Sequence, residues 1–189
     1  MVLNSKTVLS EALENAFSLK EYTSIIETIR RDDFKATPEF RKKFNGFYTV
    51  RQKKSSWYDC YYSLMEKQRI MPQSFEVILR AMYEEGHTIE VSFVSKLIAA
   101  VDPNLPIWDQ YVIKNLGFMK EWERYRQKST EERIQKAVEI YNAIINWYSE
   151  FLSSENGKLC VERFDETLPE YKEKISDVKK IDYWLWSKR

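Results

Sequence analysis

Residues Val91–Phe118 read VSFVSKLIAAVDPNLPIWDQYVIKNLGF. Apolar side chains recur at helical spacing in both halves of this stretch, and the short segment Asp102–Pro106 between them contains two prolines. Because proline ends helices and favours turns, the pattern predicts a helix, a tight loop and a second helix. If the two helices run antiparallel, side chains from the first helix and from the start of the second can face one cleft.

Helical patterns of the same kind continue over most of the chain. The 189 residues are 43% hydrophobic but include only 4 glycines and 5 prolines, a composition that favours long helices over many short strands. The strongest signal is the capping box Ser129–Glu132 followed by an apolar stripe that extends to Ser153. We therefore predict an all-α fold, a single domain over residues 1–189 with about nine or ten helices, which can form two lobes with a cleft between them.

Several local signals predict where individual helices begin and end. Serines followed three residues later by an acid are typical of helix starts, and Asn-Gly pairs are typical of helix ends. The predicted starts are Ser18–Glu21 and Ser56–Asp59, and the predicted ends are Asn45-Gly46 and Asn156-Gly157.

The composition also excludes several classes of site. His87 is the only histidine, and Cys60 and Cys160 are the only cysteines. A four-ligand zinc site cannot be assembled from this set, and we expect no metal, no cofactor and no thiol or serine–histidine catalysis. Two cysteines far apart do not form a disulfide framework, and no signal peptide or apolar run of membrane-spanning length is visible, so we expect a cytoplasmic protein without membrane contact.

Lys96 is the first candidate for chemistry, because it lies on a helix that is otherwise strongly apolar. Phe93, Val94, Leu97 and Ile98 surround it in the sequence. A lysine amine held against a hydrophobic wall loses hydration, which lowers its pKa and makes it a nucleophile. The alternative is that the side chain extends along the edge of the buried face with its ammonium in water.

Asp109 is the second candidate, at the start of the helix that follows the proline-containing loop. Its simplest role is to cap that helix and complement the helix dipole. A carboxylate there can also stabilise a developing positive charge and help a nearby lysine to lose its proton. The two roles are compatible, and only 13 residues separate Asp109 from Lys96.

These residues carry a resemblance to a known family. The segments Ser95-Lys96-Leu97 and Leu105-Pro106-Ile107-Trp108-Asp109-Gln110-Tyr111-Val112 resemble the catalytic core of the helix-hairpin-helix DNA glycosylases, and most of all the lysine-bearing, 8-oxoguanine glycosylase-like branch. The resemblance places a glycosylase-like core at residues 72–118. It implies that Lys96 attacks C1′ of an extruded nucleotide and forms a Schiff base, that Asp109 supports this step, and that the partner is damaged duplex DNA.

The DNA contacts are expected away from the hairpin of that family. The hairpin usually reads Leu-Pro-Gly-x-Gly, whereas the corresponding segment here is Glu84-Glu85-Gly86-His87-Thr88-Ile89-Glu90. The segment Phe40–Tyr58 instead combines cations with aromatic side chains, a combination that suits phosphate contact and base stacking. Its candidate DNA-binding residues are Arg41, Lys42, Lys43, Asn45, Arg51, Lys53 and Lys54, with Asn45-Gly46-Phe47 expected at a loop tip that fills the gap left by an extruded base. The alternative is a solvated basic loop over an aromatic cluster.

Three further side chains are candidates for a base pocket. Asp182 and Trp186 lie in an aromatic C-terminal segment, and Trp108 precedes Asp109. An aromatic ring can stack on an extruded base, and a carboxylate can bind a base edge. The simpler reading is that the C-terminal segment docks on the core.

Two functions from different classes follow from the sequence. The first is a base-excision DNA glycosylase that can also act as an AP lyase through Lys96. The second is a non-enzymatic helical module that binds protein or nucleic acid, in which Lys96 is a flank lysine and Asp109 is a helix cap. A hydrolase that uses Glu84 and Glu85 as paired carboxylates is disfavoured, because adjacent residues on a helix point about 100° apart.

Overall fold

The computed structural model describes residues 16–186, and every regular element in that range is helical, which confirms the predicted all-α class. The described part contains ten α-helices and one 3-10 turn, in agreement with the predicted number. They are α2 (Ala16–Ile29), α3 (Pro38–Tyr48), α4 (Ser55–Ile70), α5 (Phe75–Gly86), α6 (Val91–Val101), α7 (Gln110–Asn115), α8 (Met119–Arg124), α9 (Thr130–Ser153), α10 (Glu155–Thr167), η1 (Pro169–Tyr171) and α11 (Asp177–Trp186).

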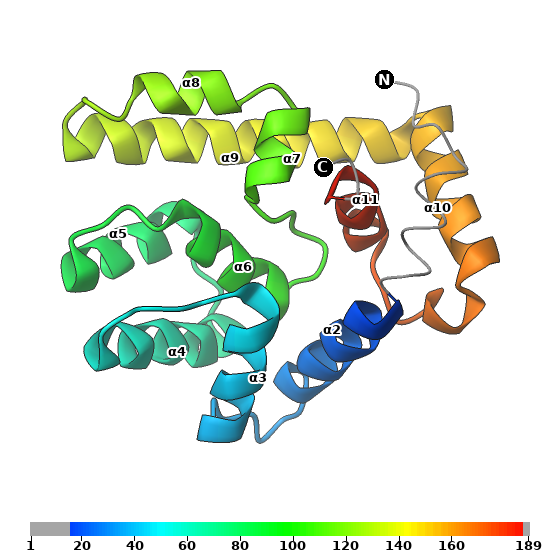
Figure 1. Cartoon of the computed structure of the whole chain (residues 1–189), viewed down its shortest axis with the longest axis horizontal. Helices are drawn as coiled ribbons and strands as arrows, with labels where there is room; N and C mark the ends of the chain where they lie inside the picture. Colours follow the sequence, from blue (N-terminus) through cyan, green and yellow to red (C-terminus); the bar gives the residue numbers. More distant parts are fainter. Residues whose placement is uncertain (1–15, 187–189) are drawn as a thin grey trace.

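The helices form two groups that share one hydrophobic core (Figure 1). Helices α3, α4, α5 and α6 lie together, with α2 packed against α3 and α6. On the other side, α9 runs along the molecule and contacts α8, α10 and α11, while α7 packs against α8 and α11. Contacts between α5 and α9 join the two groups. None of the helices between residues 16 and 186 is long and apolar enough to cross a membrane.

Helix α9 follows the sequence pattern closely. The hydroxyl of Ser129 accepts a hydrogen bond from the Glu132 backbone N–H, and the Glu132 carboxylate accepts one from the Ser129 N–H at 3.0 Å. This reciprocal cap satisfies two N–H groups that the first helical turn leaves unpaired. The buried stripe includes Ile134, Tyr141 and Tyr148. Cap and stripe together explain why both ends of α9 were predictable.

The two other predicted capping boxes are wrong. Ser18 lies inside α2, where its hydroxyl hydrogen-bonds the side chain of Tyr183. The N-cap of α4 is Lys54, which makes no side-chain capping bond, and Ser56 is already helical. The local serine–acid spacing therefore does not mark a helix start at either position.

The two Asn-Gly pairs also do not end their helices. Asn45-Gly46 lies within α3, which continues to the buried Tyr48, and the helix ends at Thr49 with a left-handed φ of 56°. The Asn45 side chain accepts a hydrogen bond from the Tyr62 hydroxyl at 2.7 Å, so it does not compete for the helix backbone. Asn156-Gly157 lies in the first turn of α10, and the break between α9 and α10 falls at Ser154.

Gly157 is required by the sharp turn between α9 and α10. A Cβ atom at this position would lie 1.9 Å from the carbonyl oxygen of Phe151, whereas a Cβ at Gly46 in α3 would meet nothing within 4 Å. We expect Gly157→Ala to lower the free energy of unfolding by about 2–4 kcal/mol, because backbone must move to relieve the overlap. The matched change Gly46→Ala should raise it by about 0.5–1 kcal/mol. Chemical denaturation measures both values, and equal effects would show that the turn adapts without strain.

Candidate active site

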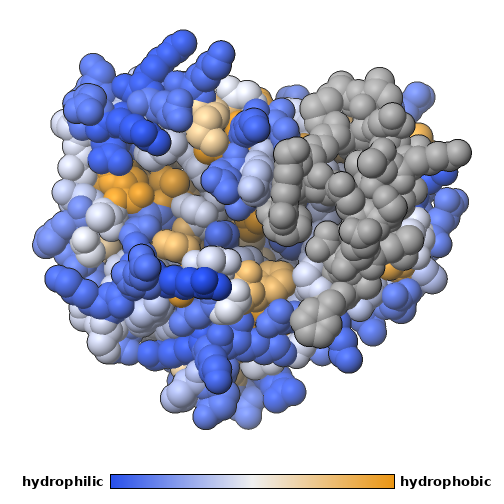
Figure 2. Space-filling view, in the orientation of Figure 1, coloured by the Kyte–Doolittle hydropathy of each residue, from blue (hydrophilic) through white to orange (hydrophobic). Residues whose placement is uncertain are grey.

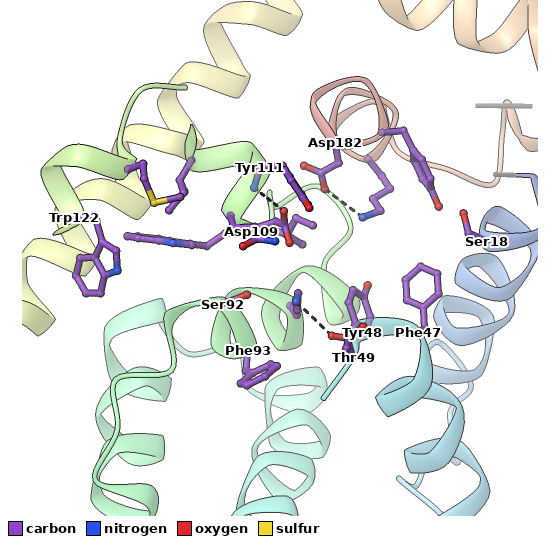
Figure 3. Close-up of a pocket in the computed structure, with 18 of the residues that line it drawn as sticks. Ser18, Phe47, Tyr48, Thr49, Ser92, Phe93, Asp109, Tyr111, Trp122 and Asp182 are labelled. Atoms are coloured by element: carbon purple, nitrogen blue, oxygen red, sulfur yellow. Dashed lines mark hydrogen bonds and ion pairs between the residues drawn. The ribbon is translucent and has the colours of Figure 1, made fainter. Parts of the chain in front are cut away.

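A cleft of about 980 Å³ lies where the two groups of helices face each other. Residues of α2, α3, α6, α7, α8 and α11 line it, together with residues of the loop between α6 and α7 (Figure 3). Figure 2 shows this face of the molecule, on which hydrophobic side chains are exposed within a largely hydrophilic surface. The cleft is large enough for a nucleotide-sized ligand, since small-molecule sites typically span about 300–1,000 Å³. Lys96, Trp108, Asp109 and Asp182 all line it.

The loop between α6 and α7 is held by two buried hydrogen bonds. Ser95 is fully buried on α6, and its hydroxyl accepts a hydrogen bond from the Trp108 backbone N–H at 2.8 Å. The hydroxyl of Tyr141, on α9, donates to the Pro106 carbonyl at 3.0 Å. These bonds pin the end of the loop to both groups of helices. As a result, Asp109, which follows Trp108, lines the same cleft as Lys96, which follows Ser95.

Asp109 is the N-cap of α7, as the sequence predicts. Its Oδ1 atom accepts a hydrogen bond from the Tyr111 backbone N–H at 2.8 Å. This bond fixes the orientation of the carboxylate at the wall of the cleft (Figure 3). Within the described residues, no ion pair of 4 Å or less joins Asp109 to a cation, so the carboxylate faces the cleft without a bound counter-charge.

Lys96 lies on α6 with its amine directed toward the end of α3. Its Nζ donates to the Tyr48 carbonyl at 3.4 Å and lies 5.5 Å from the centre of the Phe93 ring. Burial lowers the pKa of Lys96 below its ordinary value of 10.5, the charge of Asp109 opposes this, and the charge of Lys179 adds to it. A larger fraction of Lys96 is therefore the free, nucleophilic amine than for an exposed lysine.

The electrostatic effect of Asp109 on Lys96 has the opposite sign to the one expected from the sequence. We expected the carboxylate to help the lysine lose its proton, but its negative charge raises the pKa of Lys96 and favours the ammonium form. The loss of hydration outweighs this attraction. Burial, and not the carboxylate, is the feature that activates the amine.

Asp182 and Lys179 form a buried pair at one end of the cleft, which we call the ion-pair end. The carboxylate accepts a hydrogen bond from the Tyr148 hydroxyl and lies 3.4 Å from the Lys179 amine. The Lys179 amine lies between the rings of Tyr22 and Tyr183. Burial raises the pKa of Asp182, and the charge of Lys179 opposes that rise. Trp186, the third candidate for a base pocket, is the last residue of α11, and its side chain lies outside the described part of the chain.

The opposite end of the cleft is aromatic, and we call it the aromatic end. Trp108 is buried to 2% exposure and packs edge-to-face on Trp122, with ring centres 5.3 Å apart. Trp122 and Met119 belong to α8, which the sequence reasoning missed because the six-residue helix has no side-chain cap. The three-residue spacing of Met119 and Trp122 was the only signal for it. Trp108 is thus placed in the cleft lining, but most of its surface is covered by protein.

The candidate DNA-binding residues divide into two sets. Three of the cations are bound to other side chains: Arg41 pairs with Asp59 at 2.6 Å, Lys43 hydrogen-bonds Ser24, and Lys53 pairs with Glu90. The other three, Lys42, Arg51 and Lys54, are exposed and have no ion pair within the described residues. The expected loop tip at Asn45-Gly46-Phe47 is wrong, because these residues are helical. Gly46 and Phe47 nevertheless line the cleft.

A short turn, residues 87–90, joins α5 to α6, and the Glu90 side chain in it is bound to other residues, whereas Glu84 and Glu85 at the end of α5 are exposed. His87 takes a left-handed φ of 51° after Gly86 and caps α5. The Glu90 carboxylate accepts hydrogen bonds from Lys53 and from Thr88. Lys53 in turn lies over the rings of Trp57 and Phe93. The acidic hairpin is therefore neutralised in part by the segment that we expected to bind DNA.

No protein-family model, curated protein or solved structure matches this chain. The residues from 16 to 186 include no cluster of three or more histidine, cysteine, aspartate or glutamate side chains suited to a metal ion.

Ser95 should be essential to the geometry of the cleft although it carries no chemistry. Ser95→Ala removes the acceptor of the buried Trp108 N–H, and an unpaired buried N–H costs about 1–3 kcal/mol. We expect a loss of stability of that size, measured by denaturation. Ser95→Thr keeps a hydroxyl and serves as the control for loss of the acceptor. An alanine variant as stable as the wild type would show that the loop is held by Tyr141 and packing alone.

Proposed function

We propose that this protein is a DNA glycosylase-like enzyme with AP-lyase activity, in which Lys96 is the nucleophile and Asp109 the supporting carboxylate. The observation that carries the proposal is their joint position: a partly desolvated amine with lowered pKa and an oriented carboxylate line one cleft. The resemblance of residues 95–97 and 105–112 to the lysine-bearing glycosylases supports the same pair. Perturbed groups that converge in a cleft are typical of functional sites.

The proposed reaction begins with attack of the neutral Lys96 amine on C1′ of an extruded nucleotide. The new C–N bond forms as the bond from C1′ to the base breaks, and the base leaves with that electron pair and takes up a proton. Positive charge develops on the sugar in this step, and the Asp109 carboxylate stabilises it. The attached nitrogen then loses a proton. The bond from C1′ to the ring oxygen breaks as the nitrogen lone pair forms the C=N bond, the ring oxygen keeps the electron pair and takes up a proton from water, and a protonated Schiff base results.

The alternative function is a non-enzymatic binding module that uses the same cleft. In such a module, Asp109 needs no role beyond capping α7. What favours chemistry is Lys96, since a flank lysine would keep its ammonium in water. Here the Lys96 amine lies over the Phe93 ring and donates a hydrogen bond to the Tyr48 carbonyl inside the cleft. An arrangement that raises the free-amine fraction gives no advantage to a protein that only needs a positive charge.

Borohydride trapping tests the proposal directly. We expect sodium borohydride to reduce the Schiff base between the protein and a duplex with an abasic site, which gives a covalent complex visible on a denaturing gel. A second duplex with 8-oxoguanine separates glycosylase from lyase activity, because only a glycosylase exposes C1′ by removing the base. No covalent complex with either duplex would end the enzymatic proposal and leave the binding module.

Variants assign the nucleophile. Lys96→Arg keeps the charge and most of the length but cannot form the Schiff base, so trapping should disappear while the melting temperature stays close to the wild-type value. The exposed Lys174 does not line the cleft, and Lys174→Gln should trap as the wild type does. Trapping that persists in Lys96→Arg but is lost in Lys179→Gln would transfer the role to Lys179.

The pH dependence of trapping should report the protonation of Lys96. Because the neutral amine attacks, the rate should rise with pH to a plateau, with a midpoint below 10.5. Asp109 raises the pKa of Lys96, so Asp109→Asn should move the midpoint to lower pH while the plateau rate falls by about 100-fold. Rates measured between pH 5 and pH 10, a range chosen to bracket a lowered lysine pKa, separate the two effects. A midpoint that moves to higher pH in Asp109→Asn would contradict the charge effect assigned to Asp109, and a wild-type midpoint at or above 10.5 would contradict the role of burial.

A further inference from the structure

Helix α8 and the turn that follows it contribute four residues to the cleft. Met119, Trp122 and Glu123 belong to α8, Arg126 lies in the turn two residues beyond the helix end, and all four line the cleft. The first two contribute an apolar surface beside Trp108, and the last two bring charge to the rim. We call these four residues the α8 face. The sequence analysis assigned no role to any of them.

Among the lining residues that the structure describes, one cation is free to bind a phosphate. Lys96 is held at the Tyr48 carbonyl, and Lys179 is buried in its pair with Asp182. Arg126 is different, since its side chain is 72% exposed and its contact with Glu123 spans 4.0 Å. An exposed pair of this kind is weak and can be exchanged for another anion. Four carboxylates also line the cleft, those of Glu21, Asp109, Glu123 and Asp182, so an anionic strand is attracted at the rim and not deep inside.

Trp122 offers an aromatic ring on which the base of a nucleotide can stack, beside the phosphate contact that Arg126 can make. It is partly exposed and packs edge-to-face on the buried Trp108 with an angle of 74° between the rings. Trp108, fixed by its bond to Ser95, therefore supports Trp122 at the aromatic end of the cleft (Figure 3). Figure 2 shows strongly hydrophilic side chains projecting at the corner of the molecule where α8 and the start of α9 lie. An aromatic ring on α8 and an exposed guanidinium four residues further on, in the turn after the helix, suit the base and phosphate of a single nucleotide unit.

We propose that the α8 face binds the DNA strand beside the nucleotide held at Lys96, with Trp122 stacking on an unpaired base and Arg126 binding the adjoining phosphate. The inference rests on the proposed function for the identity of the partner. It adds a strand contact on the side of the cleft opposite to α3 and the loop that follows it. Glu123 opposes this contact, because its carboxylate competes with the phosphate for Arg126.

The test measures the affinity of the folded full-length variants for a short duplex with one stable abasic-site analogue, at several salt concentrations. Arg126→Gln should weaken binding and reduce the salt slope by about one phosphate contact. Arg124→Gln is the matched control, since Arg124 is exposed at the end of α8, two residues before Arg126, but does not line the cleft, and it should leave the slope unchanged. Glu123→Gln should strengthen binding.

Trp122 is tested with a strand that contains an unpaired base. Trp122→Leu should lower affinity by at least about fivefold without a change in salt slope, because stacking contributes no counterion release. Trp122→Phe keeps a ring and should retain most of the affinity, and a melting temperature for each variant separates loss of stacking from loss of folding.

The outcomes separate the two proposals. If borohydride trapping succeeds but Arg124→Gln and Arg126→Gln have the same affinity and slope, the α8 face is not the strand contact and the proposed function stands. If the wild type binds the duplex with the expected Arg126 dependence but no Schiff base can be trapped, the strand contact stands and the enzymatic proposal falls. A Trp122→Leu variant with wild-type affinity overturns the stacking role.

Discussion

The hydrogen bond from the Trp108 N–H to the buried hydroxyl of Ser95 is the contact on which the cleft depends. It joins α6 to the loop that precedes α7, and each partner has a candidate catalytic residue as its next neighbour in the chain. Lys96 follows Ser95, and Asp109 follows Trp108. One bond of 2.8 Å therefore relates the amine and the carboxylate, although the two side chains have no direct ion pair with each other. The Tyr141 bond to Pro106 extends the same constraint to α9.

This arrangement explains how a lysine can be kept partly desolvated without a counter-ion in contact. A close carboxylate would have raised the pKa of the amine strongly and kept it protonated. Asp109 is instead held by the first turn of α7 through the Tyr111 N–H, so its charge acts on Lys96 from a distance. Burial against Phe93 then dominates. The same cap bond that stabilises α7 holds the Asp109 carboxylate, which makes no ion pair with Lys96.

The sequence allowed the central part of this picture to be predicted because its signals are local. Lys96 on an apolar helix, two prolines and an aspartate at a helix start are close in the chain, and the short loop forces them together. The same holds for α9, where cap and stripe lie within one segment. The wrong predictions concern segments whose structure depends on contacts with residues far away in the sequence. Asn45-Gly46 stays helical because Phe44 and Tyr48 are buried and Tyr62 binds the Asn45 side chain. Packing between segments far apart in the sequence determines the hydrogen bonds of Ser95 and Tyr141 and the position of α8 beside the cleft. No local sequence pattern predicts such contacts.

The charge distribution of the cleft carries one further consequence for how it can act. Its deep part contains the buried Lys179–Asp182 pair and the Lys96–Asp109 set, so opposite charges balance within a small space. A ligand that enters displaces water from both sets, which strengthens every charge interaction there and at the same time disfavours the ammonium form of Lys96 further. The two tendencies oppose each other at Lys96, because Asp109 attracts the ammonium while the loss of water penalises it. Since burial already dominates in the open cleft, closing it over a neutral sugar should move Lys96 further toward the free amine. Under the proposed function, a bound nucleotide would itself favour the nucleophilic form of Lys96, provided that its phosphates remain outside, at the rim.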